Sequence, residues 1–117
     1  MENKIFLIHW NAAEAQAYAG QLERFGWQVD SEAEDGARAA RTIRATKPDL
    51  VVIYLSRLPS HGRETADYLR SLKSTRDIPV IFVGGEGEAL EKIKAKLPLA
   101  TYTTAEELES TLKTYSK

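Results

Sequence analysis

The sequence contains no cysteine. This absence excludes disulfide bonds, thiolate metal sites and cysteine nucleophiles. The 117 residues also lack any run of about 18 apolar residues, the length that a membrane-spanning helix requires. No charged and then apolar leader precedes the first apolar segment of the chain. We therefore expect a cytoplasmic protein that is not inserted into a membrane.

An excess of either charge is also missing, because 16 Lys and Arg stand against 17 Asp and Glu. Such a balance gives no electrostatic reason to expect nucleic acid or an anionic membrane as a partner. Apolar residues at 43% and charged residues at 28% are ordinary for a globular protein. The length suits one compact domain, so we expect residues 1–117 to form a single unit.

Residues 49–55 are almost wholly apolar and show no alternation with polar residues. This pattern is typical of a strand that is buried on both faces of a parallel sheet. In open α/β sheets, ligand sites lie beyond the carboxyl ends of such strands. We therefore expect Tyr54 and the residues of the following loop, Ser56, Ser60 and His61, to lie near any site.

Four more apolar segments alternate with helical repeats along the chain. The predicted strands are residues 5–8, 27–30, 49–55, 78–83 and 99–103. The helices between and after them are marked by Asn11, Asp35, Ala66, Leu90 and Thr104. Asn11 with Glu14, and Thr104 with Glu107, are spaced as capping boxes. This alternation predicts an α/β fold, a doubly wound five-stranded parallel sheet flanked by five helices.

Arg38, Arg41 and Arg44 recur along the second predicted helix, after the acidic residues Glu32, Glu34 and Asp35. Acidic residues before a helix and basic residues along it suit the helix dipole. We interpret the three arginines as a solvated face in preference to a binding patch.

Six short segments, in this order, resemble the receiver domain of bacterial response regulators. They are Lys4–Ile8, Asp35–Gly36, Lys47–Val52, Pro59–Gly62, Ile78–Ile81 and Ala105–Leu108. The resemblance spans the chain and implies the CheY-like, flavodoxin-like strand order 2-1-3-4-5. It also implies a site at the ends of strands one, three, four and five.

The chemistry of that family is missing at these strand ends. Receiver domains transfer a phosphoryl group to an aspartate, helped by two acidic residues that hold magnesium, a hydroxyl residue and a lysine. At the equivalent positions this chain has Tyr54 for the aspartate, His9 and Trp10 for the acidic pair, and Gly84 or Gly85 for the hydroxyl. The family's lysine after the fifth strand is missing, because Thr103 and Thr104 run directly into the last predicted helix. We therefore predict degenerate phosphorylation-site positions, with no catalytic residue, metal or cofactor.

Other chemistry at these positions is less favoured. His9 and His61 could face each other and, with Asn11, bind zinc or nickel, but surface histidines bonded to the loop backbone are the preferred interpretation. Tyr54 is expected to fill the vacated volume, with its hydroxyl bonded to a neighbour such as His9. Ser56 or Ser60 near a histidine lacks the surrounding pattern of a hydrolase. The glycines of residues 84–87 are interpreted as a turn.

The predicted function is that of a pseudo-receiver, a non-phosphorylatable protein-interaction module in two-component signalling. Its partner would be a kinase or another regulator, or a second copy bound through the fourth helix, fifth strand and fifth helix. A metal or small-molecule sensor in the emptied crevice is the alternative, and an enzyme using His9, Tyr54 and His61 is less favoured. Tyr102 is expected to hold one rotamer. The predicted interaction face comprises Glu91, Lys92, Lys96, Tyr102, Glu109 and Lys113.

Overall fold

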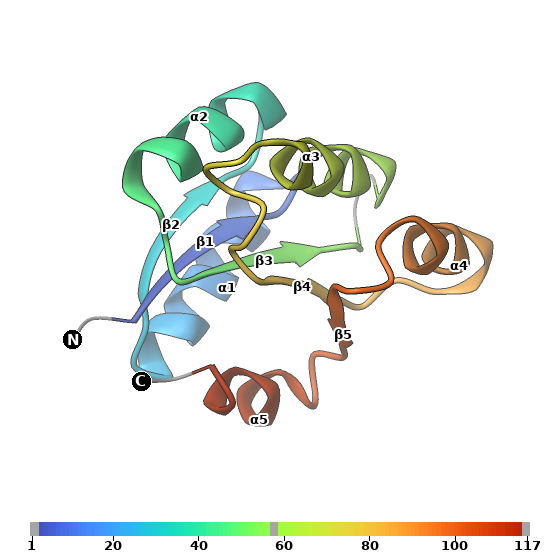
Figure 1. Cartoon of the computed structure of the whole chain (residues 1–117). Helices are drawn as coiled ribbons and strands as arrows, with labels where there is room; N and C mark the ends of the chain where they lie inside the picture. Colours follow the sequence, from blue (N-terminus) through green and yellow to red (C-terminus); the bar gives the residue numbers. More distant parts are fainter. Residues whose placement is uncertain (1–2, 57–58, 116–117) are drawn as a thin grey trace.

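The computed structural model describes residues 3–56 and 59–115. Five parallel strands form one sheet in the order β2-β1-β3-β4-β5, which confirms the predicted topology (Figure 1). The strands are β1 (Lys4–Ile8), β2 (Gln28–Glu32), β3 (Leu50–Tyr54), β4 (Val80–Val83) and β5 (Thr101–Thr103). The helices are α1 (Ala12–Arg24), α2 (Gly36–Thr46), α3 (Pro59–Ser71), α4 (Gly87–Lys96) and α5 (Leu108–Lys113).

Helices cover both faces of the sheet, with α2 and α3 on one side and α1 and α5 on the other (Figure 1). Alternate residues of β3 enter two separate cores, since successive strand residues point to opposite faces. Val51 and Ile53 pack with residues of α2, α3 and α4, whereas Val52 and Tyr54 pack with residues of α1 and α5. All five residues of β3 are buried, which explains why its sequence shows no polar alternation.

Two helices begin where the sequence predicts. The side chain of Asn11 accepts a hydrogen bond from the Glu14 amide at 3.0 Å, and that of Asp35 accepts one from the Arg38 amide at 3.1 Å. These bonds satisfy amides that have no partner within their own helix. The reciprocal half of the first capping box is absent, because the Asn11 amide donates to the His9 carbonyl instead.

Several predicted boundaries differ in the structure, among them the end of β2 at Glu32 and the start of β4 at Val80. The Thr104 hydroxyl accepts from the Glu107 amide at 3.2 Å, but this contact closes a turn and α5 begins only at Leu108. The last strand is shorter than predicted, and Leu99 is 83% exposed in the loop before it. Helix α3 begins at Pro59, so most of the predicted loop after β3 is helical. Pro at a helix start is favourable because its missing N–H needs no partner there.

Glu32, the last residue of β2, anchors the start of α2. Its carboxylate accepts two bonds of 2.7 Å from the Arg38 guanidinium and further bonds from the amides of Glu34 and Asp35. The contact with Arg38, with support from the two amides, lowers the pKa of Glu32 from 4.5 to about 2, against the opposing effect of burial. Within the described ranges, no helix is long and apolar enough to cross a membrane.

Candidate functional site

The register of the sheet brings the predicted strand-end residues to one edge. Tyr54 pairs with Val83, and Val83 pairs with Thr103 across the next strand. Ile8 pairs with Ile53, which places His9 beside Tyr54. The Gly84 amide donates to the Thr103 carbonyl at 3.0 Å, so the ends of β4 and β5 are joined as well.

Tyr54 is 3% exposed and fills the end of β3. Its ring stacks on Tyr18 of α1, with centroids 4.4 Å apart and planes inclined by 16°. Burial, with a smaller contribution from Tyr18, raises the pKa of the Tyr54 phenol. The predicted bond to His9 is wrong, because the Tyr54 hydroxyl is buried without a hydrogen-bond partner among the described residues. The Tyr54 ring therefore fills the space at the carboxyl end of β3 through packing contacts.

Sequence reasoning missed Tyr18 as a member of this site. Tyr18 is partly buried on the side of α1 that also buries Ala15 and Leu22. The helical spacing of these residues indicates a face toward the sheet. It does not indicate which strand residue the ring meets, because that depends on how α1 lies over β1 and β3.

His9 is fully buried, so its interpretation as a surface histidine is wrong. Its ring nitrogen Nε2 lies 2.7 Å from Oε1 of Glu14, and its ring lies 5.5 Å from that of Tyr54. The Nδ1 atom is buried without a hydrogen-bond partner in the described part of the chain. Glu14 explains the broken capping box, since its carboxylate turns to the imidazole of His9.

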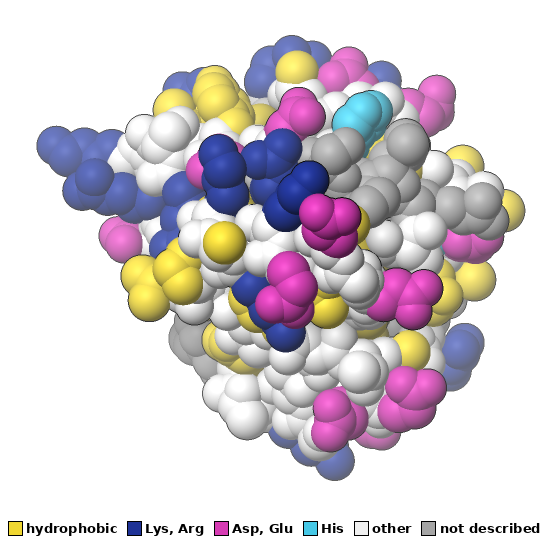
Figure 2. Space-filling model, turned by 90° about the vertical axis from the view of Figure 1, so that its right-hand side faces the viewer, with side chains coloured by type: hydrophobic (Ala, Val, Ile, Leu, Met, Phe, Trp, Pro, Cys, Tyr) yellow, Lys and Arg dark blue, Asp and Glu magenta, His cyan; other side chains and the backbone are white. Residues whose placement is uncertain are grey.

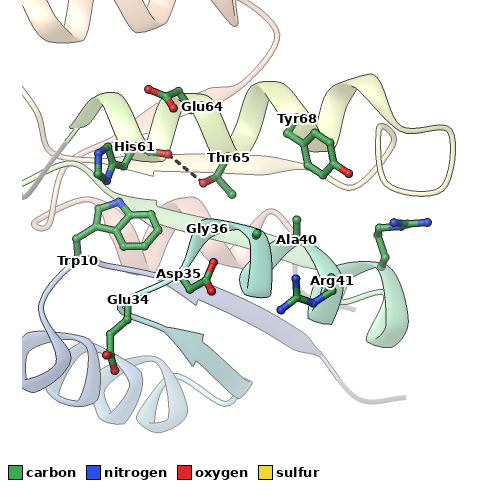
Figure 3. A pocket seen from close by; sticks show the side chains of 12 residues that line it. Trp10, Glu34, Asp35, Gly36, Ala40, Arg41, His61, Glu64, Thr65 and Tyr68 are labelled. Carbon is green, nitrogen blue, oxygen red and sulfur yellow. Dashed lines mark hydrogen bonds between the residues drawn. The ribbon is translucent and has the colours of Figure 1, made fainter.

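Trp10, the next residue, faces the other side of the sheet. Its indole packs against the core beneath α2 and α3 and meets the His61 ring edge-on, with centroids 5.8 Å apart (Figure 3). The less favoured pairing of His9 with His61 is therefore not formed, because neighbouring residues at a strand end point to opposite faces. An enzyme site that combines His9, Tyr54 and His61 is also not assembled.

The residues at this edge do not fit magnesium. That ion requires oxygen ligands in near-octahedral geometry, usually including one or two carboxylates. Here the side chains are an imidazole paired with Glu14, an indole and a stacked phenol, from His9, Trp10 and Tyr54. Within residues 3–56 and 59–115, no three His, Asp or Glu side chains converge as metal ligands.

The turn after β4 uses three glycines in the left-handed region. Gly84, Gly85 and Gly87 have φ angles of 79°, 81° and 63°. A side chain is disfavoured at such angles, so the sequence interpretation as a turn is confirmed. Beside the turn lies a hollow of about 410 Å³, lined by Leu55, Ser56, Gly85, Glu86, Ala89, Leu90 and Ile93. The side chain of Ser60 lies outside the described residues, and no hydrolase site is assigned.

Tyr102 on β5 is held by three contacts. Its hydroxyl donates to the Leu97 carbonyl at 2.8 Å and to the Ile93 carbonyl at 3.3 Å, and its ring stacks on Phe82 at 5.3 Å. Burial raises the pKa of Tyr102. These contacts tie β5 to the end of α4. The other residues of the predicted face, Glu91, Lys92, Lys96, Glu109 and Lys113, are exposed.

The surface beyond the strand ends carries both signs of charge. Figure 2 shows basic and acidic side chains interspersed on the side of the molecule toward which β3 points. Such a surface has no single sign with which to attract a polyanion.

The sequence matches no model of a known protein family and no curated protein. Solved structures do match the fold. Chemotaxis protein CheY4 of Vibrio cholerae is 18% identical with a TM-score of 0.80, covering 99% of this chain and 100% of that one. A cobalamin-binding protein from Desulfitobacterium hafniense is 17% identical with a TM-score of 0.77, covering 99% of this chain and 60% of that one.

A third structure is the receiver domain of a sensor histidine kinase from Pseudomonas aeruginosa, with magnesium coordinated in its active-site cleft. It is 21% identical with a TM-score of 0.75, and the match covers 98% of each chain. Likeness at these identities concerns the arrangement of strands and helices. The chain therefore has the CheY-like fold that these receiver domains share.

Proposed function

We propose that this protein is a pseudo-receiver, a module that is not phosphorylated and that acts in two-component signalling by binding another protein. The observation that carries the proposal is the closed end of β3, where Tyr54 replaces a carboxylate and stacks on Tyr18. The side chains of His9 and Trp10 supply no oxygen ligand for a metal ion. Catalysis forms no part of the proposal.

The proposed binding face is formed by α4, β5 and α5. The contacts of Tyr102 with Leu97 and Ile93 hold β5 against α4, which supports one fixed arrangement of this face. A kinase or another regulator is the proposed partner, and a second copy of the chain is the alternative. A cytoplasmic location belongs to the same proposal. The side chains that we assign to the face are Glu91, Lys92, Lys96, Tyr102, Glu109 and Lys113.

The first experiment tests for phosphorylation. The wild-type protein and the Tyr54→Asp variant are incubated with acetyl phosphate and magnesium, and intact mass is followed. We expect neither to gain a phosphoryl group, because the variant regains a nucleophile but keeps His9 and Trp10 where oxygen ligands belong. Loss of a single electrostatic contact in a catalytic site typically lowers the rate about 10²–10³-fold. Formation of an aspartyl phosphate in the wild type would refute the pseudo-receiver proposal.

The second experiment tests the binding face. Partner proteins are captured from cell extract with the wild type and with a Lys92→Glu, Lys96→Glu double variant. Both lysines are exposed on α4, so the fold should persist while charge complementarity is lost. Arg24→Glu on α1 is the matched control, and sedimentation measures self-association. Equal capture of the same partner by all three proteins would place the interface elsewhere.

A small-molecule sensor is the second candidate, favoured by the hollow of about 410 Å³ beside the turn after β4. Its lining is mainly apolar, with Leu55, Ala89, Leu90 and Ile93. Hydroxocobalamin is a suitable first probe because one protein of similar fold binds cobalamin. A shift in the visible spectrum of the corrin on titration with this protein would support the sensor, and an unchanged spectrum would remove cobalamin from consideration.

A further inference from the structure

A groove lies between α2 and α3, away from the stacked tyrosines. Its volume is about 810 Å³, within the range of about 300–1,000 Å³ that is usual for small-molecule sites. Residues from the end of β1 and from both helices line it (Figure 3). They are Trp10, Glu34, Asp35, Gly36, Ala37, Ala40, Arg41, Arg44, His61, Glu64, Thr65 and Tyr68.

One end of the groove is aromatic. The Trp10 and His61 rings meet there at an angle of 82°, and the indole N–H of Trp10 is buried without an acceptor among the described residues. A buried donor without an acceptor is destabilising, which leaves this end of the groove held by packing alone.

The residues in the middle of the groove are small, and the two helices pack closely at Gly36. Gly36 and Ala40 lie on α2, and Thr65 faces them from α3 (Figure 3). A Cβ atom at Gly36 would lie 3.0 Å from the Thr65 hydroxyl and 3.7 Å from the Trp10 ring. The hydroxyl of Thr65 already donates to the His61 carbonyl, so the middle offers mainly contact surface.

The α2 wall of the groove carries two free cations. Arg38 of the same helix is paired with Glu32, whereas Arg41 and Arg44 form no salt bridge within the part of the chain that the structure describes. Among the lining carboxylates, Glu34 and Glu64 point away from the groove (Figure 3). Asp35 points toward it but accepts the amide of Arg38 as the helix cap. Of the three arginines predicted to form a solvated face, Arg38 therefore holds Glu32 at the start of α2, whereas Arg41 and Arg44 can contact a ligand.

We propose that this groove binds a planar aromatic anion of the size of a nucleoside monophosphate. The ring lies against Trp10 and His61, and the anionic group lies near Arg41 and Arg44. From His61 to Tyr68 the groove follows two turns of α3, about 10 Å, which suits a base and a phosphate at opposite ends of one molecule. Tyr68, 48% exposed, adds aromatic surface beside the groove.

Fluorescence provides the test, because Trp10 lines the groove and Trp27 is buried in the other core. A Trp27→Phe protein, checked by circular dichroism, leaves Trp10 as the single indole reporter. It is titrated with AMP, GMP and 8-anilinonaphthalene-1-sulfonate. We expect saturable quenching of Trp10 by at least one probe, and about tenfold weaker binding for adenosine or inorganic phosphate than for AMP.

The matched variants locate the site. Arg41→Gln with Arg44→Gln should weaken binding about tenfold or more, whereas Arg24→Gln on α1 should leave it unchanged. All three arginines are exposed, so the variants should fold. Three results would each overturn the proposal. They are no saturation by any probe up to about 1 mM, equal binding of adenosine and AMP, and equal binding by the Arg41→Gln, Arg44→Gln protein and the Arg24→Gln protein. Phosphorylation of the chain does not enter this experiment, so the result is independent of the pseudo-receiver proposal.

Discussion

His9 and Trp10 are neighbours at the end of β1, but they occupy contrasting environments. On the His9 side the space is closed, because Glu14 and Tyr18 of α1 and Tyr54 of β3 surround a fully buried imidazole. On the Trp10 side a groove of about 810 Å³ opens between α2 and α3. Two adjacent residues thus close one face of the sheet at this strand end and border a groove on the other.

The difference follows from the size of the side chains that the helices supply. Helix α1 presents Tyr18, whose ring lies 4.4 Å from that of Tyr54. Helix α2 presents Gly36 and Ala40 on the opposite side, where Thr65 and Trp10 approach Gly36 and these small residues line the groove. Adjacent residues at one strand end can therefore border a tightly packed face and an open face of the same fold. Four substitutions can break or sharpen this contrast.

Removal of the closing ring should have the largest effect. Tyr54→Ala should lower the free energy of unfolding by about 2–4 kcal/mol, because a buried ring leaves a cavity between α1 and the sheet. Chemical denaturation measures the change. A loss below about 0.5 kcal/mol would mean that the closed side contributes little to stability and would remove the contrast between the two faces.

Removal of the Glu32 carboxylate, which anchors the start of α2, should have the second-largest effect on the free energy of unfolding. Glu32→Gln should cost about 1–3 kcal/mol at neutral pH, since it removes a charged partner of Arg38. Because folding lowers the pKa of Glu32 to about 2, its contribution is complete above the usual 4.5 and declines as pH falls toward 2. Denaturation at several pH values should show wild type and variant converging in acid. Glu23→Gln, exposed on α1, is the control and should show no such convergence.

The hydroxyl of Tyr54 should matter much less than its ring. Tyr54→Phe should leave stability unchanged or raise it by about 1 kcal/mol, because the hydroxyl is buried without a partner in the described structure. The same denaturation assay applies. A loss of more than about 1 kcal/mol would show that the hydroxyl is bonded in solution, and the closed side would then depend on polar contacts as well as packing.

The exposed tyrosine of the groove should have the smallest effect. Tyr68→Ala should change the free energy of unfolding by no more than about 0.5 kcal/mol, because nearly half of the side chain is in contact with water. Both this variant and Tyr54→Ala replace tyrosine with alanine. A difference between their free energies of unfolding therefore reports the burial of the ring and not the residue type. A cost similar to that of Tyr54→Ala would show that the groove is closed in solution.

Local patterns were sufficient for the sheet and for most helix starts. The unbroken apolar run of β3 required helices on both faces, and the alternation of strands and helices required parallel pairing. Asn11 and Asp35 cap their helices because this property depends only on residues within one turn. The prediction of a full capping box was wrong at Glu14. Its carboxylate can reach either the start of its own helix or the buried ring of His9, and it bonds to the ring.

The sequence alone determined which residue types stand at the strand ends, namely His9, Trp10, Tyr54, Gly84 and Thr103, since these can be read directly once the strands are placed. Only the tertiary structure decided that Tyr54 stacks on Tyr18, that His9 pairs with Glu14, and that Trp10 borders a groove. The period of a strand sets which face a side chain takes, but its partners on that face come from helices far along the chain. Where those helices lie depends on packing over the whole sheet, which no local pattern specifies.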